Sequence, residues 1–358
     1  MIHVNRAYYY CAICKRGMAP KDSDLDIVGT SFSPGLRRLM ARVGGKEAFD
    51  EGRRDLEELA GIFVTTKAVE RVSECVGEEI EAVAQRERKA ALSGRIVPIK
   101  PIPWMYVEMD GTGVPMVPRE TEGRQGKDET GRAKTRELKL GCVFTQTRVD
   151  EEGWPVRDDR STSYVGAIEK AEEFGRRIFT EAIKRGSRFA KQIVVIGDGA
   201  SWIWNLAALH FPAAIAIVDL YHAREHLSEL AKVVFVPGCR EEQQWTEART
   251  GELDNGDVEA VLKAMADLQP RTDVAKDEIR KAIGYFQTNA ARMRYSQFRT
   301  LGLFVGSGLI EAGCKTIAGN RLKQSGMQWT VRGANAIIAL RCSDLSGQWE
   351  QYWEHRAA

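Results

Sequence analysis

The chain has 358 residues, 43% of them hydrophobic, which is enough for a large core with one or two accessory domains. Its formal net charge at pH 7 is only +2, so any cationic surface must be local. Seven cysteines at irregular spacing suit a reducing compartment better than a disulfide framework, and no apolar run approaches the ~20 residues needed to span a bilayer. These features predict a soluble, intracellular protein.

Residues 1–30 carry a C-x-x-C pair, Cys11 and Cys14, directly after the aromatic run Tyr8–Tyr10. Such a turn is half of a zinc ribbon, because a closed structural zinc site needs four ligands and this segment supplies two. His3 is a candidate for a third ligand, and a reduced cysteine pair in a turn is the alternative interpretation. We therefore expect a partial zinc-ribbon-like segment with an incomplete Zn²⁺ site.

Residues 31–95 show helical periodicity. A first helix is expected from Pro34 to the pair Gly44–Gly45, where the glycines predict its end. Two further helices are expected at Glu47–Leu59 and from Thr65 to about Val76, joined by a short glycine-containing turn.

The last two of these helices form a helix-turn-helix pattern, whose second helix can enter a DNA major groove with Lys67 and Arg71 facing outward. An ordinary helical hairpin with solvated charges is the alternative. The charged stretch Glu78–Lys89 then leads to prolines that predict a linker and a domain boundary, namely Pro98, Pro101 and Pro103.

Residues 102–222 alternate strand-like and helix-like patterns. The expected strands lie at residues 104–109, 113–117, 138–149, 192–197 and 214–218, and an amphipathic helix fits Val165–Lys184. With a short helix before the last strand, this is the βββαβαβ order of the ribonuclease-H-like fold. In that fold the first strand lies beside the fourth, so acidic residues at the ends of both strands meet at one edge of the sheet.

Two acids stand at these two strand ends, Asp110 and Asp198, and a third, Glu311, lies in the expected opening turn of a helix that follows Gly306. Carboxylates gathered from distant points of a chain repel one another unless a cation neutralises them, and Mg²⁺ prefers a few carboxylates plus phosphate oxygens. The pattern predicts a Mg²⁺ (or Mn²⁺) site that cuts phosphodiester bonds with two ions, Asp110 bridging both and the other two acids each completing one shell.

Asp219 competes for the role of second acid because it also closes an apolar run, but the strand before Asp198 directly follows the amphipathic helix. His222 can orient a phosphate or steady a displaced base, or it can hydrogen-bond the carboxylate of Asp219. His226 lies one helical turn further on, and the H-x-x-x-H spacing can bind zinc. Since no Glu follows His222 directly, we do not expect a metalloprotease-like site.

Residues 223–300 carry no strand signal and predict a helical insertion, after which residues 301–358 complete the core. A cluster of cations and one tryptophan follows Glu311 and is expected to hold a DNA backbone and stack a splayed base: Arg321, Lys323, Trp329 and Arg332. The alternative places the tryptophan in the core and the cations in solvent. The expected fold class is α/β, with a ribonuclease-H-like catalytic core, a helical insertion, a preceding small helix-turn-helix domain and the zinc-ribbon-like N-terminus.

Four long motifs occur in order along the chain, at Glu108–Pro115, Gly197–Asn205, Asp219–His226 and Gly306–Arg341. On these motifs the chain, from Tyr8 to Trp353, resembles the bacterial insertion-sequence DDE transposases of the ISKra group, within the Mutator-like superfamily.

The resemblance implies Mg²⁺-dependent DNA cleavage and strand transfer at the ends of a mobile element. Asp110, Asp198 and Glu311 match the family's catalytic triad, and Asp219 and His222 match its D-x-x-H motif. The implied partners are double-stranded DNA, as terminal inverted repeats and target DNA, and further copies of the chain on that DNA, with no membrane. The implied location is cytoplasmic and nucleoid-associated.

The resemblance also implies an N-terminal zinc-binding region with an earlier C-x-x-C, inside which this sequence is expected to begin. Two alternatives stay open for function. One is a non-catalytic DNA-binding remnant of a transposase. The other is a ribonuclease-H-like nuclease or resolvase that cuts without strand transfer, since both reactions use the same ions and acids.

Overall fold

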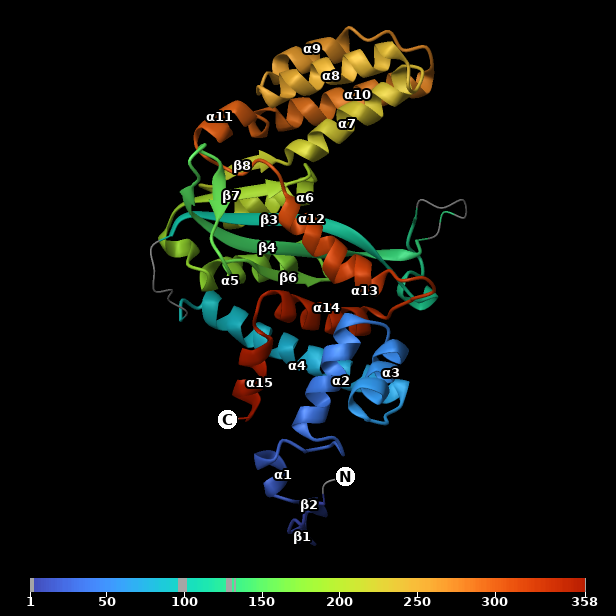
Figure 1. The fold of residues 1–358 in the computed structure, drawn as a ribbon, viewed down its shortest axis with the longest axis vertical. Coiled ribbons are helices and arrows are strands. Elements are labelled where there is room, and N and C mark those ends of the chain that lie inside the picture. The colour runs from blue at the N-terminus through green and yellow to red at the C-terminus, as the bar shows by residue number, and fades with distance from the viewer. Residues whose placement is uncertain (1–2, 96–101, 127–130, 132, 358) are drawn as a thin grey trace.

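The computed structural model describes residues 3–95, 102–126, 131 and 133–357. A mixed sheet occupies the middle of the elongated molecule, a lobe of helices lies at one end of it, and a second layer of helices lies on the opposite side (Figure 1). The N-terminal hairpin lies beyond this second layer. In the described residues, no helix is both long and apolar enough to cross a bilayer.

The central sheet, as described, has six strands: β3 (Ile102–Pro115), β4 (Thr135–Val149), β5 (Pro155–Arg157), β6 (Ser163–Ala167), β7 (Ala190–Gly197) and β8 (Ile215–Val218). The strand order is β5-β4-β3-β7-β8, and β6 also pairs with β4. The pairings of β4 with β3, β5 and β6 are antiparallel, whereas β7 is parallel to both β3 and β8. The expected neighbours, the strands that precede Asp110 and Asp198, are therefore paired.

Two strand assignments from the sequence need correction. The expected strands at 104–109 and 113–117 are one strand, because Gly111 and Gly113 remain in the ladder opposite Lys139 and Glu137 instead of forming a turn. Two strands that were not expected, β5 and β6, follow β4, and β6 includes the first residues of the expected helix at Val165–Lys184. The helix itself is shorter.

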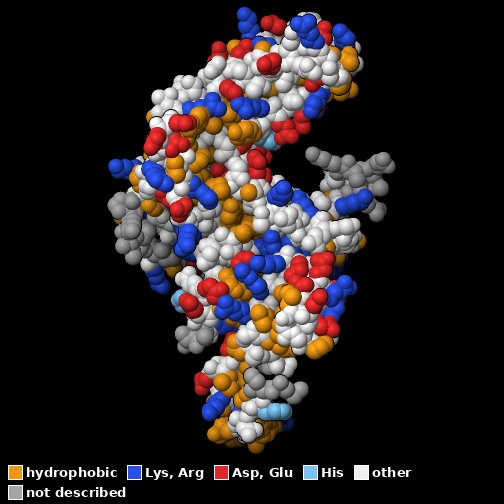
Figure 2. Space-filling view, in the orientation of Figure 1, with side chains coloured by type: hydrophobic (Ala, Val, Ile, Leu, Met, Phe, Trp, Pro, Cys, Tyr) orange, Lys and Arg blue, Asp and Glu red, His pale blue; other side chains and the backbone are white. Residues whose placement is uncertain are grey.

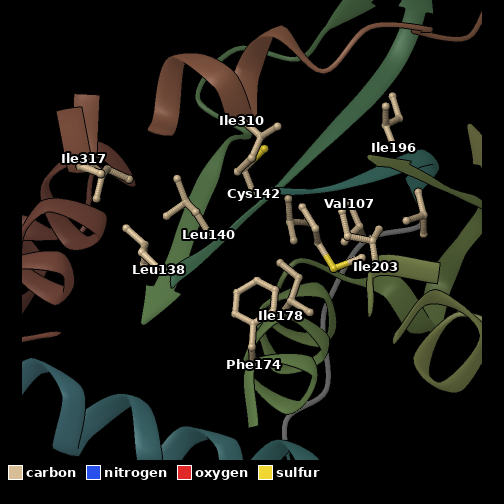
Figure 3. Packing of buried hydrophobic residues seen from close by; sticks show 14 of the residues in the cluster. Val107, Leu138, Leu140, Cys142, Phe174, Ile178, Ile196, Ile203, Ile310 and Ile317 are labelled. Atoms are coloured by element: carbon tan, nitrogen blue, oxygen red, sulfur yellow. The ribbon is translucent and has the colours of Figure 1, made fainter. Parts of the chain in front are cut away.

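Helices cover both faces of the sheet. On one face lie α5 (Ala171–Lys184) and α6 (Ser201–His210), and a Cβ at Gly141 would lie 2.7 Å from the side chain of Ile178 in α5. On the other face lies α12 (Gly308–Gly313), which continues through a π-helical segment, η4 (Cys314–Gly319), into α13 (Asn320–Leu322). Figure 3 shows Ile310 of α12 near Cys142 of the sheet, and Phe174 and Ile178 approaching from α5. The core is thus a sheet enclosed between helices.

The second helical layer consists of α2 (Pro34–Lys46), α3 (Phe49–Ala60), α4 (Thr66–Leu92), α14 (Val331–Leu345) and α15 (Trp349–Ala357). The α4 helix runs to Leu92 rather than ending near Val76, so it includes the charged stretch Glu78–Lys89. Ion pairs attach its second half to α5, from Glu81 to Arg177 at 2.7 Å and from Glu87 to Lys184 at 2.7 Å. The long helix of the expected helix-turn-helix pair therefore also contacts the main core.

Two further expectations concern the end of α2 and the linker after α4. The α2 helix continues through Gly44 and Gly45 to Lys46, because Gly44 serves close packing: a Cβ there would lie 2.1 Å from the hydroxyl of Ser73 in α4. Of the prolines expected to form a linker, Pro98 and Pro101 lie outside the described residues.

The remaining elements lie at the two ends of the molecule. The N-terminal hairpin consists of β1 (Tyr9–Cys11) and β2 (Arg16–Met18), followed by α1 (Lys21–Asp24). The helical lobe follows β8 and contains α7 (Leu220–Val234), α8 (Arg240–Asp254), α9 (Val258–Ala266), α10 (Asp273–Asn289) and α11 (Tyr295–Thr300). The described residues from Leu220 to Thr300 therefore form helices and no strand.

We expect Gly77→Ala in α4 to destabilise the protein by about 1–3 kcal/mol, because the new Cβ would lie 2.1 Å from the backbone oxygen of Ala336 in α14. The matched control is Gly284→Ala in the interior of α10, where a new Cβ meets nothing within 4 Å. Because alanine favours a helix more than glycine does, this change should not destabilise the protein. Urea unfolding of both variants measures the contrast. Equal stabilities would contradict this account of the α4–α14 contact.

Candidate functional site

Three carboxylates from distant parts of the chain line one cavity of about 690 Å³. Asp110 lies on β3, Asp198 follows the end of β7, and Glu311 lies in the first turn of α12. The other lining residues are Met109, Tyr221, His222, Arg224, Glu225, Ser228, Thr246, Thr250 and Ser307. Figure 2 shows the molecule hollowed beneath the helical lobe, with acidic and histidine atoms on the lobe side and Lys and Arg atoms on the wall below.

Asp198 is held in a tight turn at the carboxyl end of β7. Its Oδ1 accepts a hydrogen bond from the backbone N–H of Ala200 at 2.8 Å, and its backbone oxygen accepts one from the hydroxyl of Tyr285 at 2.9 Å. The next residue, Gly199, has φ +103°, and a Cβ there would lie 2.5 Å from the Tyr285 ring. This turn therefore requires glycine and is braced by α10 of the lobe.

Asp110 has both carboxylate oxygens engaged by local donors. The backbone N–H of Gly111 donates to Oδ1 at 2.6 Å, and the thiol of Cys314 donates to Oδ2 at 3.3 Å. Burial is the main factor that raises the pKa of Asp110, and the negative charge of Asp198 raises it further. The two acids are therefore close enough to repel one another.

The helix that carries Glu311 is anchored by two buried carboxylates. Glu108 accepts a hydrogen bond from the N–H of Ile310 at 2.9 Å, and Asp219 accepts one from the N–H of Ser307. Both of these N–H groups belong to the start of α12, where backbone N–H groups lack partners within the helix. The hydroxyl of Ser307 in turn donates to Glu311 at 3.2 Å. These bonds set the position of Glu311 relative to β3.

Sequence reasoning missed Glu108, which is only 1% exposed. Burial raises its pKa to about 8, and the hydrogen bonds from the N–H of Ile310 and the thiol of Cys142 oppose this shift. The available signal was an acid inside an apolar strand run, two residues before Asp110 and on the same face of the sheet.

Asp219 is 1% exposed and is not among the residues that line the cavity. Its Oδ1 accepts a hydrogen bond from the backbone N–H of His222 at 2.7 Å, which caps α7, and its other oxygen serves Ser307. The structure thus gives Asp219 a structural position and places Asp198 at the cavity.

His222 lines the cavity, and its backbone N–H, rather than its ring, provides the hydrogen bond to Asp219. Its ring lies 4.9 Å from that of His226, and the His226 ring lies 4.2 Å from that of Tyr285. Burial lowers the pKa of His226, and the neighbouring His222 lowers it further. The three rings therefore pack in series, with His222 at the cavity and His226 and Tyr285 behind it, outside the lining.

No group of three or more His, Cys, Asp or Glu side chains converges closely enough to hold a metal ion within the described residues. In the N-terminal hairpin, Cys11 and Cys14 are both exposed. The N–H of Cys14 donates to the Cys11 sulfur at 3.5 Å and, more than any other group, lowers the pKa of that thiol.

Two of the residues expected to contact DNA are buried. Arg321 is 0% exposed and donates to the backbone oxygen of Gly44 at 3.0 Å, and its guanidinium lies 4.6 and 5.1 Å from the ring centroids of Phe49 and Trp329, which contact each other edge to face. Trp329 is 7% exposed, and its indole N–H donates to the oxygen of Leu322 at 3.0 Å. This corrects the expected stacking surface: here the cation and the tryptophan join α13 to α2 and α3.

The other four cations of the prediction are exposed. Lys323 donates to the hydroxyl of Thr112 on β3 at 2.6 Å, which places it beyond Asp110 along the same strand. Arg332 pairs with Glu78 of α4, and Lys67 pairs with Glu70 at 2.6 Å. Arg71 is likewise exposed on α4.

Residues 162–356 match the profile of the Uncharacterised protein family UPF0236. The chain belongs to this family. Among solved structures it is similar to one titled "Drosophila P element transposase strand transfer complex", with 10% sequence identity, a TM-score of 0.28, and coverage of 94% of this chain and 85% of that chain. A TM-score at this level carries no argument about fold or function. No curated protein matches the sequence.

We expect Glu108→Ala to destabilise the protein by about 2–4 kcal/mol, since it leaves the N–H of Ile310 buried without a partner and opens a cavity. Glu108→Gln is the matched control, because its amide oxygen accepts the same hydrogen bond, and we expect a loss below about 1.5 kcal/mol. Chemical denaturation measures both. If the two variants lose equal stability, the hydrogen bond to α12 is not the stabilising contact.

We expect Arg321→Ala to destabilise the protein by about 3 kcal/mol, because it removes a fully buried side chain that packs against Phe49 and Trp329. Lys323→Ala, a change to an exposed cation of the same segment, should alter stability by less than about 0.5 kcal/mol. Thermal and urea unfolding compare the two. An Arg321→Ala variant as stable as the wild type would contradict a stabilising role for the buried Arg321 side chain.

Proposed function

We propose that this chain is a DDE transposase that uses Mg²⁺ or Mn²⁺ to cut DNA at the ends of an insertion sequence and join them to a target. The single observation that supports this most strongly is the cavity shared by Asp110, Asp198 and Glu311. A fold gathers three carboxylates from separate elements at a net electrostatic cost, which a bound cation offsets.

The donor set fits a hard divalent ion. Its ligands are carboxylate oxygens, which Mg²⁺ and Mn²⁺ favour, and the repulsion between Asp110 and Asp198 is what such an ion relieves. Bound there, metal ions would activate the attacking oxygen and stabilise the leaving one. Asp110 and Glu311 would need to leave their bonds to Cys314 and Ser307, both of which involve single side-chain donors.

The remaining residues of the cavity would orient the substrate. Glu108 and Asp219 fix the start of α12 and so the position of Glu311, while Tyr285 fixes the Asp198 turn. His222 faces the same cavity and is the group placed to donate a hydrogen bond to a phosphate oxygen.

The order of the sheet supports a ribonuclease-H-like core. The β3 strand lies between antiparallel β4 and parallel β7, and four strands, of which β5 has only three residues, are followed along the chain by a helix, a strand, a helix and a strand. The narrower assignment to the ISKra group rests on the four sequence motifs. A transposase must hold two element ends together, so we propose that the chain acts as a homo-oligomer on DNA.

We expect Asp110→Asn, Asp198→Asn and Glu311→Gln each to abolish Mg²⁺-dependent cleavage, because each amide keeps the size of the acid and loses the charge that a metal needs. Glu225→Gln, a change to another acid of the cavity wall, is the control and should keep most activity. Gel analysis of a labelled element end with a target plasmid measures cutting and joining separately, alongside thermal unfolding of each variant.

Each result of this assay bears on a different statement. Cutting without joining would favour a nuclease or resolvase. Binding without cutting by the wild type would favour a non-catalytic remnant. Asp198→Asn with near-normal cutting, beside an inactive but folded Asp219→Asn, would reverse the choice of second acid.

We expect Lys323→Ala to weaken binding to all DNA sequences alike and to lower the slope of log affinity against log salt by about one unit, since Lys323 lies exposed beside Thr112. Arg332→Ala should change the slope less, because Arg332 is paired with Glu78. Fluorescence anisotropy over a salt series measures both. An unchanged slope for Lys323→Ala would show that Lys323 does not contact the bound DNA.

A further inference from the structure

Tyr221 is a solvent-exposed aromatic residue on the wall of the carboxylate cavity. Its side chain is 62% exposed, although the adjacent Leu220 is buried in the core. An aromatic ring offers a large apolar surface that favours a stacked partner over water. The exposed ring therefore needs an explanation that the packing of α7 does not give.

The ring is held in place by two neighbours. The guanidinium of Arg224, one turn of α7 away, lies 5.4 Å from the ring centroid. A Cβ at Gly306 would lie 2.9 Å from the ring edge, so the ring lies against the backbone that leads into α12. A preplaced ring loses little conformational entropy when a ligand stacks on it.

Arg224 is itself fixed by Asp254 of α8, to which its Nε donates at 2.9 Å and its Nη2 donates a second hydrogen bond. This bidentate pair compensates the positive charge of Arg224. Because its charge is compensated, Arg224 is better suited to stacking beside Tyr221 than to binding a phosphate.

We propose that Tyr221 and Arg224 form a stacking site for one unpaired nucleobase, next to the phosphate held at the carboxylates. The second half of this statement rests on the proposed function, whereas base binding itself does not. Nucleobases stack on aromatic rings and on guanidinium planes irrespective of sequence. A base within a duplex has both faces covered, so the site selects a strand whose base is unpaired.

The test compares Tyr221→Ala with the wild-type chain for binding of a fluorescently labelled oligothymidylate and of a blunt duplex, in Ca²⁺. Loss of one stacked base, about 1–3 kcal/mol, corresponds to roughly 5- to 150-fold weaker binding. We expect a loss in this range for oligothymidylate and less than about twofold for the duplex. Tyr221→Trp and Tyr221→Phe should both keep wild-type affinity, because stacking uses the ring and not the hydroxyl.

The matched control is Trp154→Ala, which removes an exposed aromatic residue outside the cavity, with 53% exposure, and should leave both affinities unchanged. Equal losses for single strand and duplex, or a Tyr221→Phe variant as weak as Tyr221→Ala, would overturn the proposal. Normal cutting with no effect of Tyr221→Ala on single-strand binding overturns the stacking site alone. Tyr221-dependent base binding without any cutting overturns the proposed function alone.

Discussion

The anchoring of α12 by two buried carboxylates is the constraint on which the geometry of the cavity depends. Glu108 comes from the central strand and Asp219 from the end of β8, and each accepts a hydrogen bond from the start of the helix that carries Glu311. Together they join the sheet, the lobe and the C-terminal part of the core at one point. Because both carboxyl groups are almost fully buried, losing either hydrogen bond would leave a polar group without water or partner.

This arrangement separates two kinds of acid that look alike in the sequence. Asp110 and Asp198 lie at the cavity and are partly exposed, whereas Glu108 and Asp219 lie beneath it and satisfy backbone N–H groups. The difference follows from the sheet: two residues along β3 move a side chain from under α12 to the cavity. The burial of each acid, and not its residue type, determines whether it lines the cavity or accepts hydrogen bonds from backbone N–H groups.

The sequence was informative where a pattern is local and poor where packing decides. The end of β7 and the opening turn of α12 were predictable, because an apolar run and glycine-rich turns mark them, whereas β3 continues through Gly111 and Gly113 to Pro115. The burial of Arg321 was not, since nothing in a single sequence shows that Phe49 and Trp329 pack against it. The continuation of α2 through Gly44 was equally hidden, because glycine there serves contact with another helix and not the end of its own.

The hydrogen bond from Tyr285 to the backbone of Asp198 makes the helical lobe part of the cavity's construction rather than an appendage. The lobe also supplies Tyr221, Arg224 and Thr246 to the cavity wall. A chain shortened to its sheet would therefore retain the acid at the end of β7 but lose the hydroxyl that braces its turn. Relatives that differ in the length or helices of this insertion can keep the same chemistry only if they replace that brace.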